Sequence, residues 1–197
     1  MIKEKEIKEL KKMEGKVRGV TLLTDMDYIK SNKGEKGLEK FKQSLNKTIP
    51  ELDLENIKNT AWYPVGYRIL SLLIIKDCFD FSNKDIIDIG YKAPKISFVV
   101  KTLMRYFVSL EKTFKEASKY WKEHWTVGQL ESAFIDLKER YLIIKIKGFK
   151  AHPVMCAYWK GYFGAIAELS LNNKKVTVEE KKCIAGGDDH HEFWLRW

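Results

Sequence analysis

The hydrophobic pattern changes its period near Val127, and this change limits the folds open to the chain. From Leu110 to Trp125, apolar side chains recur at the spacing of one helix face. Residues 130–137 and 141–147 alternate instead with the period of two that predicts strands. Because the helical patterns come first and the strand patterns last, the sequence predicts an α+β fold, with an antiparallel sheet packed against several helices.

Glycine and proline set the limits of the other predicted elements. Helices are expected over residues 2–13, 38–49, 64–81, 83–90 and 98–107, with another opening at Pro153. Strands are expected over residues 17–23, 174–183 and 192–197. The helix after Pro153 carries a stripe of small residues that includes Gly161 and Gly164. Since glycine inside a helix costs about 0.5–1 kcal/mol relative to alanine, this stripe predicts a close backbone approach, here to the sheet.

The length of 197 residues predicts a single domain. Within it, residues 1–60 form an N-terminal extension of the same unit, residues 61–126 the helical part, and residues 127–197 the sheet with its metal motif. Apolar residues make up 45% of the chain, which is enough for a full core. Three cysteines give no disulfide framework, and no apolar segment follows Met1, so a cytoplasmic location is expected.

The charge pattern argues against direct nucleic-acid binding. The chain carries 36 Lys plus Arg against 27 Asp plus Glu, a formal net charge of +9. The lysines are interleaved with glutamates, as in residues 3–12 and 112–123, and this is typical of solvated helix faces. The longest apolar run, at residues 72–75, is far shorter than the roughly 20 residues needed to cross a bilayer. No membrane span is predicted.

Four potential metal ligands stand in the C-terminal part of the chain: Cys156, Glu180, Cys183 and His191. Zinc takes thiolate, imidazole and carboxylate ligands in a tetrahedron, and four protein ligands make a structural site. The strand period places Glu180 on the apolar face of its strand, where a lone carboxylate is costly unless it is paired or bound to metal. Alternatively, the two cysteines are small core residues. The set predicts one structural zinc ion per chain.

The same segments resemble a known family, the 4-vinyl reductase domain. The resemblance is carried by residues 156–164, by the Glu-x-x-Cys at 180–183 and by residues 187–193. It covers about residues 127–197 closely and the helical part only loosely. Family members with a zinc site have a final cysteine two residues before a phenylalanine, and here His191 stands at that position before Phe193. This departure leaves open whether the metal is bound.

The resemblance implies a domain that binds small hydrophobic molecules, as in the sensor domains of phenol-responsive bacterial transcription activators. It also implies a fold shared with the vesicle-tethering subunits of transport-particle complexes. A homodimer is expected, because the helical part has more apolar helix faces than one sheet can cover. The ATPase and DNA-binding modules of those activators are missing from this sequence, so a separate protein partner is expected to receive any signal.

Aromatic side chains of the helical part supply the chemistry of a pocket for a hydrocarbon or aromatic ligand. The candidates are Trp62, Tyr63, Phe98, Met104, Phe107, Phe114, Trp121 and Trp125. Aromatic residues at helical spacing are also common in plain hydrophobic cores. The family resemblance favours a pocket for the group as a whole.

No catalytic set emerges from the sequence. None of the histidines stands in a nucleophile-elbow or HExxH frame, and Gly186-Gly187 leads into no helix that would bind phosphate. The predicted function is therefore binding or sensing of a small hydrophobic molecule by a protein with structural zinc, without enzymatic activity. Two alternatives stay open: an interaction scaffold like the vesicle-tethering subunits, and a reductase-type enzyme.

Overall fold

The computed structural model describes residues 2–96 and 109–197, so the helix predicted over residues 98–107 lies outside the described residues. The helices are α1 (Glu4–Lys11), α2 (Val20–Thr48), α3 (Val65–Phe79), α4 (Asn83–Ile96), α6 (Leu110–Lys115), α7 (Ala117–His124) and α8 (Pro153–Ser170), with a short 3-10 helix η1 (Ile184–Gly186). The strands are β1 (Lys16–Arg18), β2 (Trp62–Pro64), β3 (Gln129–Asp136), β4 (Tyr141–Lys147), β5 (Thr177–Lys182) and β6 (His190–Arg196). This arrangement confirms the predicted α+β class.

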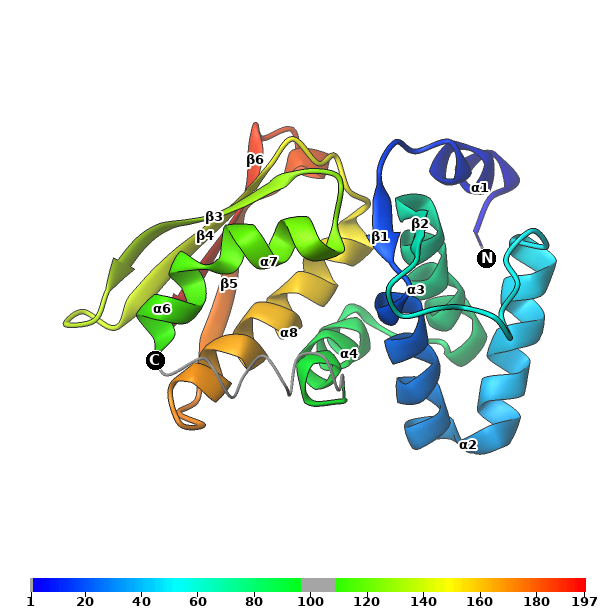
Figure 1. Cartoon of the computed structure of the whole chain (residues 1–197), viewed down its shortest axis with the longest axis horizontal. Coiled ribbons are helices and arrows are strands. Elements are labelled where there is room, and N and C mark those ends of the chain that lie inside the picture. Colours follow the sequence, from blue (N-terminus) through cyan, green and yellow to red (C-terminus); the bar gives the residue numbers. More distant parts are fainter. Residues whose placement is uncertain (1, 97–108) are drawn as a thin grey trace.

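The main sheet has four antiparallel strands in the order β3-β4-β6-β5 (Figure 1). Alternate residues of β4 and β6, among them Ile144, Ile146 and Phe193, are fully buried on one face. Helix α8 packs against β5 and β6, while α6 and α7 pack against β3. The C-terminal strand predicted from alternation therefore lies inside the sheet, and its buried face meets the helices that build the site described below.

The N-terminal elements α1, α2, α3, β1 and β2 lie together at the opposite end of the molecule from the sheet (Figure 1). The strand predicted over residues 17–23 is wrong in its second half, because β1 ends at Arg18 and α2 begins at Val20. The spacing of Leu22, Met26 and Ile29, all buried, is that of a helix face and outweighs the β-branched residues at its start. No helix in the described ranges is long and apolar enough to cross a membrane.

Helices α4 and α8 cross with their backbones in direct contact. A Cβ atom built on Gly161 would overlap the carbonyl oxygen of Ile87, and one built on Gly90 would overlap that of Tyr158. The partner predicted for the small-residue stripe is thus wrong at Gly161, which meets a helix and not the sheet. Gly164 does face the sheet, but its Cβ would lie 3.1 Å from a side-chain carbon of Val178 on β5 and not against a backbone.

Replacing Gly161 by alanine is expected to lower the free energy of unfolding by about 1–3 kcal/mol, because the new methyl group forces the two backbones apart. Chemical denaturation followed by circular dichroism measures this change. Gly186→Ala is a matched control, since the nearest atom to its Cβ is 3.9 Å away. Equal stability of the two variants would show that the helix crossing adapts freely.

Candidate functional site

The four predicted metal ligands come together between α8 and the sheet. Cys156 lies in the first turn of α8, Glu180 on β5, Cys183 just after β5, and His191 on β6. Their ligand atoms all lie within 4.8 Å of one another. Residues that are up to 35 positions apart in the chain thus form one cluster, as the strand pattern and the helix start at Pro153 predict.

The distances within the cluster suit a tetrahedral metal ion. The Sγ atom of Cys156 lies 3.5 Å from Sγ of Cys183 and 3.4 Å from Nδ1 of His191. Nδ1 of His191 lies 3.9 Å from Oε1 of Glu180. Ligands of a tetrahedral ion with bonds of about 2.0–2.3 Å lie roughly 3.3–3.8 Å apart. Little movement is needed to place an ion at the centre.

The ring of His191 is oriented by the backbone. Its Nε2 lies 3.1 Å from the carbonyl oxygen of Phe149, and a carbonyl only accepts hydrogen bonds, so Nε2 carries the hydrogen. Nδ1 then turns its lone pair toward the cysteine thiols. Metal-binding histidines are commonly fixed in this way, with the second ring nitrogen donating to a carbonyl or carboxylate.

Burial makes a thiolate unfavourable in the metal-free cluster. It raises the pKa of the Cys156 thiol, and the neighbouring Glu180 and Cys183 raise it further. Oε1 of Glu180 is shielded from solvent and has no hydrogen-bond partner. A cation would reverse both costs, because a coordinating thiol is deprotonated outright and the carboxylate oxygen gains a partner.

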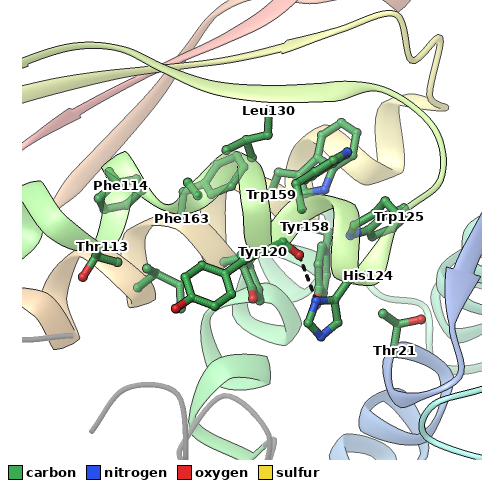
Figure 2. A pocket seen from close by; sticks show the side chains of 14 residues that line it. Thr21, Thr113, Phe114, Tyr120, His124, Trp125, Leu130, Tyr158, Trp159 and Phe163 are labelled. Atoms are coloured by element: carbon green, nitrogen blue, oxygen red, sulfur yellow. Dashed lines mark hydrogen bonds between the residues drawn. The ribbon is translucent and has the colours of Figure 1, made fainter. Parts of the chain in front are cut away.

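A cavity of about 130 Å³ lies between α6–α7 and α8. Its lining is dominated by aromatic and aliphatic side chains, namely Phe114, Ala117, Tyr120, Trp121, Trp125, Leu130, Tyr158, Trp159, Tyr162, Phe163 and Ile166, with Thr21, Thr113 and His124 as polar members. Figure 2 shows Thr113 and Phe114 at one end of this cavity and His124 with Thr21 of α2 at the other. The cavity therefore joins the sheet part of the fold to the N-terminal helices.

Hydrogen bonds fix two side chains of the wall. Nδ1 of His124 lies 3.0 Å from the backbone oxygen of Tyr120, so it donates there and leaves Nε2 as an acceptor (Figure 2). The indole Nε1 of Trp121 donates to the backbone oxygen of Val127 at 3.0 Å. Trp121 also stacks on Trp125, with ring centroids 5.2 Å apart. These contacts hold one aromatic wall of the cavity in place.

The structure brings three of the predicted pocket residues together, since Phe114, Trp121 and Trp125 line the cavity. Trp62 and Tyr63 lie elsewhere, on β2. Trp62 lies under the guanidinium of Arg18, and the Tyr63 hydroxyl accepts from the backbone N–H of Lys58. Phe98, Met104 and Phe107 lie outside the described residues.

Sequence reasoning missed the contribution of α8 to this wall. Tyr158, Trp159, Tyr162 and Phe163 all line the cavity. Their spacing of one and four residues is visible in the sequence and places two aromatic pairs one turn apart on the helix. The prediction for this helix was based instead on its small-residue stripe, which lies on the opposite face. The aromatic spacing is therefore the signal that identifies this wall.

Trp159 connects the cavity to the metal-ligand cluster. Its ring centroid lies 5.9 Å from that of Trp121 and 5.3 Å from that of His191, which it meets edge to face. Trp159 is also almost fully buried and follows Cys156 by one helical turn. Trp159 therefore contacts both the cluster and the aromatic wall of the cavity.

No family model and no curated protein matches this sequence. Solved structures of H-NOX (heme nitric oxide/oxygen-binding) proteins share its fold. An Fe(II) H-NOX protein from S. oneidensis is 10% identical, with a TM-score of 0.69 over 91% of this chain and 95% of that chain. An Fe(II) unliganded H-NOX mutant from K. algicida is 15% identical, with a TM-score of 0.65 over 91% and 95%. A structure described as modulating heme redox potential through porphyrin distortion has a TM-score of 0.62 at 11% identity, over 91% and 99%.

These comparisons correct two predictions. The likeness to the 4-vinyl reductase domain is wrong as a family assignment, because the solved structures that cover 91% of the chain are H-NOX proteins. Structural zinc is wrong as the expected cofactor, because those proteins are described with Fe(II) and heme. The resemblance rested on short segments near the cysteines, and such segments report a local motif more reliably than a family.

The described residues do not fit a heme. Pockets for drug-sized ligands measure about 300–1,000 Å³, and this cavity is about 130 Å³, with Trp121, Trp125 and Trp159 in its lining. His124, which lines the cavity, would be the residue to hold a heme iron, through Nε2. However, no lysine or arginine of the described ranges lines the cavity to pair with heme propionates. The comparisons thus assign the H-NOX fold to this chain, and its ligand has to be inferred from its own cavity.

Proposed function

We propose that this chain is a small-molecule-binding domain whose ligand is a single-ring aromatic molecule. The observation that supports this proposal is the cavity of about 130 Å³ with an aromatic lining. An engineered apolar cavity of about 150 Å³ binds benzene, so the volume of this pocket, which is partly open to solvent, suits one ring. The void also favours a ligand-binding domain over a scaffold, in which side chains would fill the same space.

The polar members of the lining favour a ring that carries one hydroxyl group. His124 offers Nε2 as an acceptor. The hydroxyl groups of Thr21 and Thr113 lie at opposite ends of the cavity and donate to the backbone oxygens of Arg18 and Ser109, so they too can accept a hydrogen bond. A few placed polar groups in an apolar pocket fix the orientation of a ligand. A phenol therefore fits this lining better than a plain hydrocarbon.

We propose that the cluster of Cys156, Glu180, Cys183 and His191 holds one transition-metal ion. Thiolate and imidazole ligands suit such ions, and the convergent lone pair of His191 and the unpartnered oxygen of Glu180 support this role. The ion would tie the first turn of α8 to β5 and β6. Because Trp159 contacts both His191 and the cavity tryptophans, the site would hold the aromatic wall in its ligand-binding position.

Phenol is expected to bind the purified protein with a Kd between about 10 µM and 1 mM, which corresponds to roughly −4 to −7 kcal/mol. Ala117→Leu adds volume inside the cavity from a half-buried position on α7, and we expect it to weaken binding at least about tenfold. Isothermal titration calorimetry measures both values.

Trp62→Ala is the matched control, because it removes an aromatic side chain outside the cavity. It should leave the Kd for phenol unchanged. Absence of saturable binding to the unmodified protein, or equal affinity in Ala117→Leu, would contradict the proposed ligand site. Benzene and toluene in the same titration test the preference for a hydroxyl group.

A further inference from the structure

The four-stranded sheet has a second face that is turned away from α8, and we call it the outer face. Alternate residues build it: Phe134 of β3, Tyr141 and Ile143 of β4, and Trp194 with Arg196 of β6. Phe134 is 46% exposed, and Leu137, in the turn that follows β3, is 55% exposed. Across residues 2–96 and 109–197, these two are the exposed large apolar side chains. The exposed large apolar side chains of the described ranges thus lie on the outer face, at Phe134, and in the adjoining turn, at Leu137, and not on a helix face, where the sequence predicted a dimer contact.

The aromatic rings of the outer face form a continuous stack across three strands. The ring of Tyr141 lies 5.3 Å from that of Phe134, with 22° between the ring planes. On its other side it lies 5.9 Å from the ring of Trp194, at 16°. The guanidinium of Arg196 lies 5.7 Å and 5.6 Å from the Tyr141 and Trp194 rings. Side chains held in this way lose little conformational entropy when a partner docks on them.

The charged side chains of the outer face balance one another. Its salt bridges are Lys147–Glu131 at 2.8 Å, Lys145–Glu192 at 3.3 Å and Lys181–Glu179 at 2.6 Å. The chain as a whole has a formal net charge of +9. The outer face is therefore close to neutral on a strongly basic protein.

This charge balance indicates which kind of partner fits the outer face. Nucleic acid is attracted to lysines and arginines that have no acidic neighbours, so a neutral face suits it poorly. Two copies of a chain with charge +9 repel each other, and this repulsion is weakest where the local charge is balanced. Alternating acids and bases also allow a two-fold mate to place acidic groups against basic ones. We propose that the outer face is the contact between two copies of this chain.

Sedimentation velocity over micromolar to submillimolar concentrations tests the proposal. The unmodified chain is expected to dimerise. Phe134→Glu/Leu137→Glu, at two exposed positions, should raise the dimer Kd at least about tenfold. Arg196→Glu, at another exposed position of the outer face, should also weaken the dimer.

Asn59→Glu/Thr60→Glu is the control, because it makes the same change in net charge in an exposed loop far from the sheet. It should dimerise like the unmodified chain, and unchanged melting temperatures would show that all variants are folded. A monomeric unmodified chain at the highest concentration overturns the proposal. So does a dimer that survives both outer-face variants, or one that the control variant disrupts to the same extent.

Discussion

Replacing Cys183 by serine is expected to weaken cobalt(II) binding by more than about 100-fold. The expected size follows from metal sites in which loss of an outer-shell partner alone costs about 10–100-fold, so loss of a ligand costs more. Cobalt(II) bound by thiolates gives sulfur-to-metal charge-transfer absorption, and titration of that band measures the affinity. The native metal content of each variant is measured in parallel by elemental analysis of protein purified without chelator.

The stability of the protein should follow the metal. A ligand present at 100 times its Kd stabilises the folded state by about 2.7 kcal/mol, so the unmodified protein should melt at a higher temperature with cobalt(II) than without it. Cys183→Ser should lose this increase. Cys78→Ser is the matched control, because Cys78 is a half-buried thiol on α3 that contacts Ser44 and is not part of the cluster. Equal cobalt affinity in Cys183→Ser and Cys78→Ser would rule out a metal site at these four residues.

The clustering of Cys156, Glu180, Cys183 and His191 was predictable, because each residue stands in or next to an element with a clear sequence signal. Pro153 sets the start of α8 and so places Cys156 in its first turn. The strand period of two turns Glu180 inward, and β6 brings His191 to the same end of the sheet. Local sequence patterns therefore predict the positions of these four residues almost completely. The identity of the metal is a different matter, since the same donor atoms suit several transition metals.

The cavity was predictable only in part, because a void is a property of packing. The helical spacing of Phe114, Trp121 and Trp125 indicates that they share one face, and they do line the cavity. It does not indicate that this face meets the aromatic side of α8. The contact between these two faces depends on how α8 is rotated about its axis. The crossing of α4 and α8, which Gly90 and Gly161 allow, fixes that rotation. Trp62 is also an aromatic residue of the helical part, but it lies on β2, where it packs against Arg18 and does not line the cavity.

Asp25→Ala is expected to lower the free energy of unfolding by about 3–5 kcal/mol, because it leaves the charge of Arg68 buried without its partner. Both side chains are fully buried and form a salt bridge between α2 and α3. The Ser71 hydroxyl donates to the same carboxylate at 2.6 Å. Urea denaturation measures the loss, and for a domain of this size each kcal/mol shifts the melting temperature by about 2–4 °C.

The double variant Asp25→Leu/Arg68→Met should recover most of that stability, since well-packed apolar residues can replace a buried ion pair at little cost. The native pair already leaves Oδ1 of Asp25 and two guanidinium nitrogens of Arg68 without hydrogen-bond partners, so little is lost with it. Arg68 also lies 4.4 Å from the ring centroid of Tyr158, which lines the cavity. In Asp25→Ala, Arg68 is no longer held by its salt bridge and no longer fixes the ring of Tyr158. Asp25→Ala should therefore weaken phenol binding as well. A double variant as unstable as the single one would show that the ion pair itself, and not its unpaired remnant, decides stability.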